Sequence, residues 1–121
     1  MITEELELLV KDEAENLKKY ALPRELAKLS FSKLFPWAYN KCIYGQMTGN
    51  CHSERAKELL SKCAIPYSVE LKKRHLLDYK MFEYVGATRN FSAIEFYIAQ
   101  DDSSCELLIN FLQGRSEVLE L

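Results

Sequence analysis

The sequence predicts a mainly α-helical protein, a compact bundle of about five to six short helices in a single domain over residues 1–121. Apolar residues recur at three- and four-residue steps through much of the chain, and residues that cap helices precede several of these stretches. A length of 121 residues also suits one domain. The composition, 48% hydrophobic and 28% charged, is that of an ordinary globular protein.

The first predicted helix begins after Thr3 and extends to about Tyr20. The Thr3 hydroxyl can accept a hydrogen bond from a free N–H group of the first turn, where Glu4 and Glu5 also interact favourably with the helix dipole. The apolar residues of its inner face are Leu6, Leu9, Val10, Ala14 and Leu17. This pattern is typical of a helix that packs on a core.

Pro23 suits the first position of a second helix, because the N–H group that proline lacks has no partner there. Pro36 ends this stretch or starts the next helix. The residues expected to face inward are Leu26, Ala27 and Leu29.

A third helix is predicted from Pro36 to Thr48, where Tyr39, Ile43 and Met47 follow one another at four-residue steps. Gly49 is a natural stop after it. Gly45 lies inside this helix, where glycine costs about 1 kcal/mol relative to alanine. We therefore expect another backbone or a ligand to approach Gly45 closely.

Residues 50–52 form a tight connection to a fourth helix, which Ser53 caps and Pro66 closes. Its predicted inner face consists of Ala56, Leu59, Leu60 and Cys63. The sequence further predicts a helix over about 69–78, and residues 79–85 are aromatic and β-branched enough to form a strand.

Two capping boxes, at residues 92–95 and 103–106, each indicate a helix start. The first competes with a strand, since Ile94, Phe96 and Ile98 alternate with their neighbours, so a small β hairpin around residues 79–98 stays open. The second is followed by Leu108, Phe111 and Leu112 on one face and by Gly114 at the stop position.

Charge is unevenly distributed although the net charge is only −2. The segment 18–80 carries thirteen Lys or Arg against five acidic residues, whereas segments 1–17 and 81–121 are both acidic. Such asymmetry indicates either a surface for an anionic partner or acidic ends that fold over a basic middle.

Four cysteines and two histidines could supply metal or thiol chemistry. Cys42, Cys51 and Cys63 are separated by eight and eleven residues, and only His52 adjoins one of them, so the paired spacing of a structural zinc site is absent. A thiolate at Cys51 near a helix start, with His75 as a distant base, or zinc at Cys51 and His52, is the second alternative function. We expect no cofactor, and core positions for Cys42 and Cys63.

Nucleic-acid binding through the basic segment 18–80 is the main alternative function. This segment combines lysines and arginines with aromatic residues, which contact phosphates and stack on bases respectively. The aromatic residues are Trp37, Tyr39, Tyr44 and Tyr67. The two helices over residues 36–63 also loosely follow a helix-turn-helix arrangement, although the second one presents Glu54 and Glu58 beside its basic residues.

The preferred function is a small non-enzymatic binding or regulatory protein that acts on another protein or on a second copy of itself. The acidic N-terminus and the lack of a long apolar run predict a cytoplasmic protein that does not enter a membrane. Its size and lack of motifs are typical of bacterial or phage accessory proteins, by analogy alone. The residues expected at the binding site are Trp37, Tyr44, Gly45, Asn50, Cys51, His52 and Arg55.

Overall fold

The computed structural model of the chain describes residues 4–34, 38–65, 92–100 and 105–121. This part is helical, which confirms the predicted mainly α-helical bundle. The elements are α1 (Glu4–Tyr20), α2 (Pro23–Leu26), the 3-10 helix η1 (Phe31–Lys33), α3 (Ile43–Thr48), α4 (Glu54–Cys63), α7 (Ala93–Gln100) and α8 (Cys105–Leu112).

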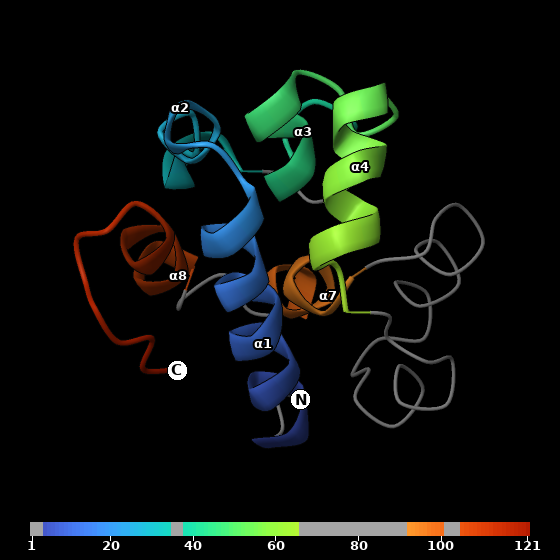
Figure 1. Cartoon of the computed structure of the whole chain (residues 1–121). Coiled ribbons are helices and arrows are strands. Elements are labelled where there is room, and N and C mark those ends of the chain that lie inside the picture. The colour runs from blue at the N-terminus through green and yellow to red at the C-terminus, as the bar shows by residue number, and fades with distance from the viewer. Residues whose placement is uncertain (1–3, 35–37, 66–91, 101–104) are drawn as a thin grey trace.

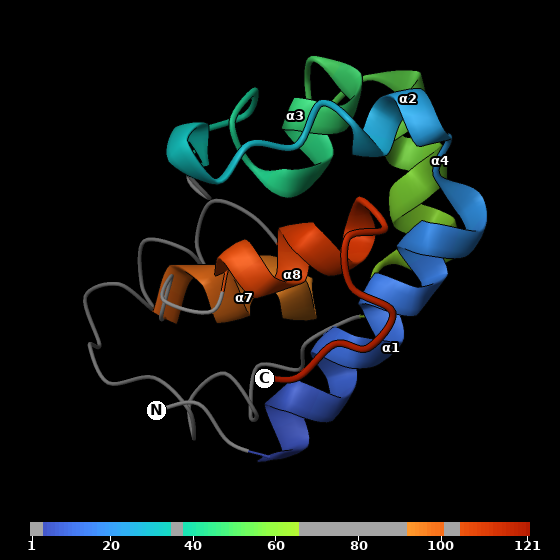
Figure 2. The ribbon, with the colours of Figure 1, turned by 90° about the vertical axis from the view of Figure 1, so that its left-hand side faces the viewer.

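Helix α1 is the element around which the others assemble, because it packs against α4, α7 and α8 (Figure 1). Its predicted inner face is largely confirmed, since Leu6, Val10, Ala14 and Leu17 are fully buried. Leu9, the fifth residue of that prediction, is only partly buried against the core. Helices α7 and α8 run crosswise to α1, while α2, η1 and α3 gather beyond its C-terminal end (Figure 2). The acidic first turn of α1 lies at the opposite end of the molecule.

Helix α2 is a single turn with Pro23 at its start, as predicted. Leu26 and Leu29 are buried, whereas Ala27, which we expected to face inward, is exposed. Ala27 is the C-cap of this helix and still has helical backbone angles, so its side chain points away from that of the adjacent, buried Leu26. Gln113 completes the end of α2, since its Nε2 donates hydrogen bonds to the carbonyl oxygens of Leu26 and Leu29 at 2.9 and 2.8 Å.

Helix α3 begins at Ile43, so the prediction that the helix starts at Pro36 and includes Tyr39 is wrong. The chain instead turns at residues 38–42, where the N–H groups of Lys41 and Cys42 both donate to the Ala38 carbonyl at 3.1 Å. The Cys42 sulfur then caps α3 by accepting a hydrogen bond from the Gly45 N–H at 3.3 Å. Tyr39 is consequently 55% exposed.

The two glycines of this region have different roles. Gly49 ends α3 in the left-handed conformation, with φ of 91°, as predicted. A Cβ atom on Gly45 would lie 2.3 Å from the Tyr39 carbonyl oxygen. The expected close approach to Gly45 is therefore confirmed, and the approaching group is the backbone of Tyr39.

Helix α4 is capped by Ser53, whose side chain accepts a hydrogen bond from the Ala56 N–H at 3.2 Å, as predicted. Ala56, Leu59 and Cys63 are buried, while Leu60 is half-buried. Helix α8 buries Leu108, Phe111 and Leu112, and Gly114 follows it with φ of 79°.

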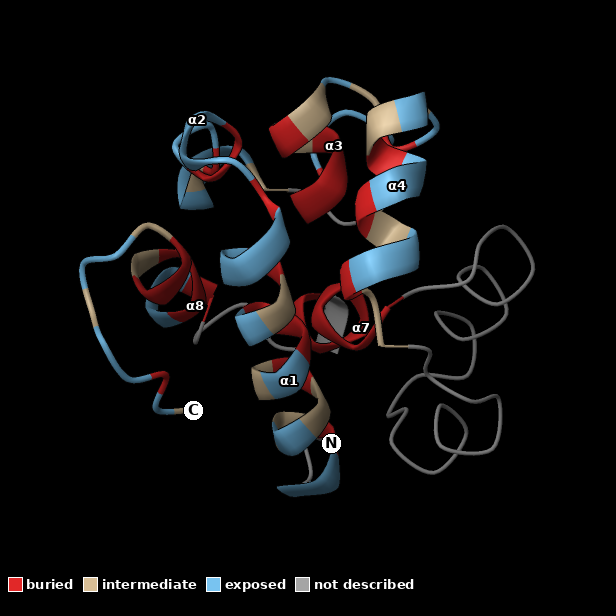
Figure 3. Cartoon of the chain, viewed as in Figure 1, coloured by how far each residue is buried: buried red, intermediate tan, exposed pale blue. Residues whose placement is uncertain are grey.

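Residues 93–98 are helical, which decides against a strand there. The Ser92 hydroxyl accepts a hydrogen bond from the Glu95 N–H at 3.4 Å, as its capping box predicts. Every residue from Ser92 to Ile98 is buried (Figure 3), so this part of α7 has no solvent-exposed face. The alternation of Ile94, Phe96 and Ile98 with their neighbours therefore does not indicate a strand. The rest of the possible hairpin and the helix predicted over 69–78 lie outside the described residues.

None of the helices in the described ranges combines the length and apolar character needed to cross a bilayer.

Replacing Gly45 with alanine tests the contact with Tyr39. We expect Gly45→Ala to lower the free energy of unfolding by about 2 kcal/mol, because the new methyl group displaces a backbone carbonyl. Gly49→Ala should cost only about 1 kcal/mol, since its surroundings are open and only the backbone conformation is unfavourable. Urea unfolding measures both values. A Gly45→Ala protein as stable as the wild type would contradict the close approach.

Candidate functional site

The residues predicted to form a binding site do not converge on one surface. Tyr44 is fully buried, and Gly45 is buried against Tyr39. His52 is exposed, and Trp37 lies outside the described residues. The corner between α3 and α4 is therefore mainly a structural connection.

Asn50 and Cys51 stabilise this corner through the backbone. The Asn50 Oδ1 accepts a hydrogen bond from the His52 N–H at 2.8 Å, which closes a tight turn. The Cys51 N–H donates to the Tyr39 carbonyl at 2.8 Å, the same carbonyl that lies against Gly45. Tyr39 thus ties the 38–42 turn to both α3 and the corner.

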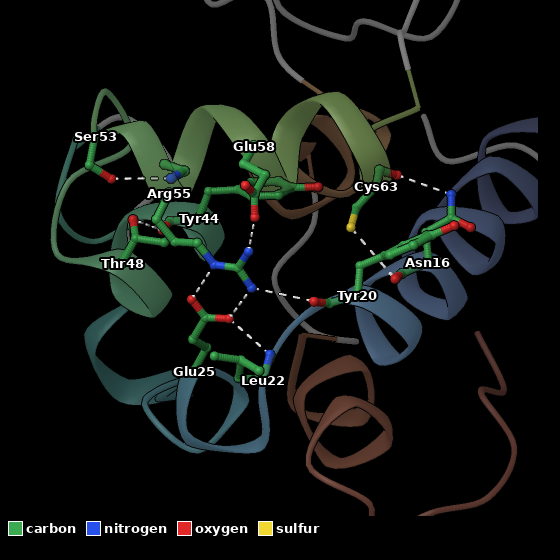
Figure 4. A network of polar contacts seen from close by, with 11 residues as sticks. Asn16, Tyr20, Leu22, Glu25, Tyr44, Thr48, Ser53, Arg55, Glu58 and Cys63 are labelled. Carbon is green, nitrogen blue, oxygen red and sulfur yellow. Dashed lines mark hydrogen bonds and ion pairs between the residues drawn. The ribbon is translucent and has the colours of Figure 1, made fainter.

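Arg55 is the centre of a polar network that joins α1, α2 and α4 (Figure 4). Its Nε and Nη2 donate to the two carboxylate oxygens of Glu25 at 2.8 and 2.7 Å. Its Nη2 also lies 3.3 Å from the Tyr20 carbonyl, and its Nη1 pairs with Glu58. The Arg55 guanidinium lowers the pKa of Glu25, which also accepts a hydrogen bond from the Leu22 N–H at 2.8 Å. Through these contacts Arg55 joins α4 to α2 and to the end of α1, so its role is structural.

The geometry gives little support to a reactive thiolate or a zinc site at the cysteines. All four cysteines are buried and none forms a disulfide, which confirms core positions for Cys42 and Cys63. Burial, and then the nearby Glu13 carboxylate, raise the pKa of Cys63 to about 11, so this thiol is protonated at neutral pH. Cys51 is buried while the neighbouring His52 is exposed, and His75 lies outside the described residues.

Within residues 4–34, 38–65, 92–100 and 105–121, no three His, Cys, Asp or Glu residues are grouped so that they could hold a metal ion.

The sequence reasoning missed Glu13, a fully buried carboxyl in the middle of α1. It accepts hydrogen bonds from the Tyr44 hydroxyl at 2.6 Å, the Ile94 N–H at 3.1 Å and the Ile65 N–H at 3.3 Å. Its position gives a signal that could have revealed it, because Glu13 follows Val10 by three residues and precedes Leu17 by four, within the apolar stripe.

Burial raises the pKa of Glu13 to about 6, although its hydrogen-bond donors act in the opposite direction. Burial and the adjacent Glu13 carboxylate also raise the pKa of Tyr44, so the tyrosine hydroxyl keeps its proton and remains a donor. A perturbed buried acid often marks an active site. Glu13, however, lines none of the three surface hollows described below, and its contacts fit a structural role.

Three hollows on the surface offer places for a ligand or partner. The basic hollow, of about 730 Å³, is lined by Lys28, Ser30, Ser32, Lys33, Leu34, Asn40, Lys41 and Gln46. The C-terminal hollow, of about 510 Å³, is lined by Leu107, Asn110, Arg115, Ser116, Glu117, Val118 and Glu120. A third, of about 650 Å³, lies between α1, α2 and the end of α8, with Lys18, Lys19 and Arg115 among its lining residues. None of the seven residues predicted for a binding site lines these hollows, although the basic hollow lies wholly within segment 18–80, the segment predicted for nucleic-acid binding.

Comparison with protein-family models, curated proteins and solved structures finds no match to this chain. Its function is therefore argued from the geometry of these surfaces.

The raised pKa of Glu13 predicts how the free energy of unfolding depends on pH. Because its pKa is higher in the folded chain, at about 6, than the ordinary value of 4.5, protonation favours folding. Its contribution to stability is complete below pH 4.5 and is lost as the pH rises through about 6, by about 2 kcal/mol in total. Glu13→Gln cannot titrate. The stability of the wild type relative to Glu13→Gln should therefore fall by about 2 kcal/mol between pH 4 and pH 7.

Chemical unfolding at several pH values measures this difference, and Glu15→Gln on the exposed side of the same helix is the matched control. Parallel pH profiles for the wild type and Glu13→Gln would refute the explanation.

The Arg55 network makes a second prediction. Removing the guanidinium leaves the Glu25 carboxylate buried without its main partner, so Arg55→Ala should lower the free energy of unfolding by about 2 kcal/mol at pH 7. Arg55 is itself partly exposed, which places this value below that of a fully buried pair. Lys57→Ala, which removes only an exposed contact with Glu54 at 3.9 Å, should change stability by less than about 0.5 kcal/mol.

The cost of Arg55→Ala should also depend on pH. The pKa of Glu25 is lowered in the folded protein, so this contribution is present at neutral pH and is lost as the pH falls below the ordinary value of 4.5 and through the folded pKa. Thermal unfolding of the two variants at pH 7 and pH 3 measures the effect. Equal costs for Arg55→Ala and Lys57→Ala at pH 7 would show that the network is unimportant.

Proposed function

We propose that this chain is a non-enzymatic binding protein that holds a segment of another protein at the C-terminal hollow. The observation that carries this proposal is the pairing of Leu107, 50% exposed, with Val118, 63% exposed, in the lining of one hollow. Exposed apolar groups that share a concave surface with a polar rim are typical of protein-binding sites. A single exposed leucine elsewhere needs no such explanation.

The surroundings of this apolar pair also favour a protein partner. Leu107 belongs to α8, and the segment after α8 is held to it by Arg115, whose backbone N–H donates to the Asn110 carbonyl at 2.8 Å. The Arg115 side chain also donates to the Asn110 Oδ1 at 2.6 Å. The hollow is thus preformed, and binding does not need to order it.

The rim selects the chemistry of the partner. Glu117 and Glu120 line the hollow, and Arg115 is already hydrogen-bonded to Asn110. An apolar side chain flanked by Lys or Arg therefore complements the site. A symmetric contact with a second copy would instead place the same acidic residues opposite each other.

Buried acids and cysteines bear on whether the chain is an enzyme and on where in the cell it acts. The buried Glu13 carboxyl, whose pKa is raised, and the sulfur atoms of Cys42 and Cys63 all have structural hydrogen-bond partners, which supports a role without catalysis and without a cofactor. The acidic N-terminal segment and the four buried cysteines, which form no disulfide, suit a cytoplasmic protein. A bacterial or phage origin stays an analogy from size alone.

Site-specific photo-crosslinking tests this function. A photoreactive amino acid at Glu120, an exposed position on the rim, should yield a discrete protein adduct in cells of the native host. Leu107→Asp should reduce the adduct at least 10-fold, because a carboxylate in the apolar centre is desolvated without a partner. Leu8→Asp is the matched control, since Leu8 is 58% exposed on α1 and is not among the lining residues.

The identity of the crosslinked protein tests the predicted chemistry of the partner. Mass spectrometry should find a basic segment of a different protein attached at position 120. Adducts that persist in Leu107→Asp, or that consist only of a second copy of this chain, would contradict the proposal.

A further inference from the structure

The basic hollow brings together three lysines from three short segments of residues 28–41. Lys28 follows α2, Lys33 belongs to η1, and Lys41 lies in the 38–42 turn. No acidic residue lines this hollow, and the structure shows no ion pair for any of the three lysines within the described part of the chain. The positive charge is therefore uncompensated at this surface.

The walls of the hollow are held in place by polar contacts rather than by long helices. The Ser30 N–H donates to the Gln46 Oε1 at 2.8 Å, and the Gln46 Nε2 donates back to the Ser30 carbonyl at 3.3 Å. This reciprocal pair fixes the segment between α2 and η1 on α3. The Tyr39 carbonyl, which lies against Gly45 and accepts a hydrogen bond from the Cys51 N–H, holds the 38–42 turn that carries Lys41.

Exposed aromatic residues stand in the same two segments as these lysines. Phe31, beside Ser32 and Lys33, is 43% exposed, and Tyr39, close to Lys41, is 55% exposed. Neither ring lines the hollow, but Phe31 lies between the lining residues Ser30 and Ser32, and Tyr39 precedes the lining residue Asn40. Positive charge with exposed aromatic rings beside it is the arrangement that binds single-stranded nucleic acid, in which lysines contact phosphates and rings stack on unpaired bases.

The charged residues of α4 argue against binding of duplex DNA by that helix, and the lysines of the basic hollow argue against a protein ligand there. Arg55, on α4, is engaged with Glu25 and Glu58, and Lys57 lies near Glu54, so α4 does not present the basic face that a groove-reading helix needs. Lysine is depleted at the centres of protein interfaces. Lys28, Lys33 and Lys41 instead line a hollow, and the exposed rings of Phe31 and Tyr39 adjoin its lining residues in the sequence. Such rings stack on unpaired bases.

We propose that the basic hollow is a binding site for single-stranded nucleic acid, in which Lys28, Lys33 and Lys41 contact phosphates and Phe31 and Tyr39 stack on bases. This site is separate from the C-terminal hollow and does not depend on the function proposed for it. It also assigns a use to part of the positive charge in segment 18–80.

Fluorescence anisotropy with a labelled 12-nucleotide oligodeoxythymidine tests this site. Binding should weaken as salt rises, with a log–log slope of about −2, the value for three phosphate contacts on a single strand. Each of Lys28→Ala, Lys33→Ala and Lys41→Ala should make the slope shallower by about 0.7. Lys57→Ala, which removes a lysine outside the hollow, should leave the slope unchanged, as should Leu107→Asp in the C-terminal hollow.

An abasic oligonucleotide of the same length separates base stacking from attraction to phosphate alone. We expect it to bind the wild type at least about 5-fold more weakly than oligodeoxythymidine, because stacking on one base is worth at least that factor. The Phe31→Ala/Tyr39→Ala double variant should bind both oligonucleotides alike. Lysine-to-arginine variants keep the charge and should retain binding, which controls for folding.

Three results would overturn the site. They are a salt slope near zero, unchanged binding in the Lys28→Ala/Lys33→Ala/Lys41→Ala triple variant with circular dichroism confirming its fold, and a labelled poly-glutamate peptide that binds as tightly as oligodeoxythymidine. The last result would assign the hollow to an acidic protein segment. Equal binding of the abasic strand by the wild type would remove the stacking role and, with it, the single-strand assignment.

Discussion

The buried carboxylate of Glu13 is the constraint on which the arrangement of this bundle depends. A carboxylate removed from water is costly unless its oxygens accept hydrogen bonds, and here the donors come from Tyr44, Ile65 and Ile94. These residues belong to α3, to the end of the α4 segment and to the start of α7. All three segments must therefore reach the same point on α1 at once, which fixes their positions relative to the central helix.

Beyond the C-terminal end of α1, the structure relies on polar contacts because the local elements are too short to be stable alone. Helix α2 is one turn, η1 has three residues and α3 has six. The Gln46 pair with Ser30 joins these pieces to one another, and the Arg55 contact with Glu25 and the Gln113 cap join α2 to α4 and to the end of α8. A rigid frame thus positions loops that carry exposed side chains, an arrangement that is common at binding surfaces.

The same contacts explain why two surfaces of this chain differ in chemistry. Arg55 is held by Glu25 and Glu58, whereas Lys28, Lys33 and Lys41 stand around a hollow without acidic residues. The C-terminal hollow has an apolar pair and a rim that includes Glu117 and Glu120. One surface therefore complements phosphate groups, and the other complements an apolar side chain with basic neighbours.

The sequence by itself determined the helical class, the face of α1 that is buried, the caps at Ser53 and Ser92, the stop at Gly49 and a close backbone approach at Gly45. These features depend on local periodicity and on residues whose backbone or hydrogen-bonding preferences act over a few positions. Local signals misjudged the start of α3, since the Ala38 carbonyl and the Cys42 cap form a turn there.

Only the tertiary structure decided the partners of Glu13 and Arg55 and the composition of the hollows. Glu13 contacts Tyr44 and Ile94 across 31 and 81 positions of the chain, and Arg55 meets Glu25 across 30. The three lysines of the basic hollow likewise come from segments whose spacing in the sequence carries no periodic signal. Such contacts are set by the packing of whole helices against one another, so a pattern read along one segment cannot specify them.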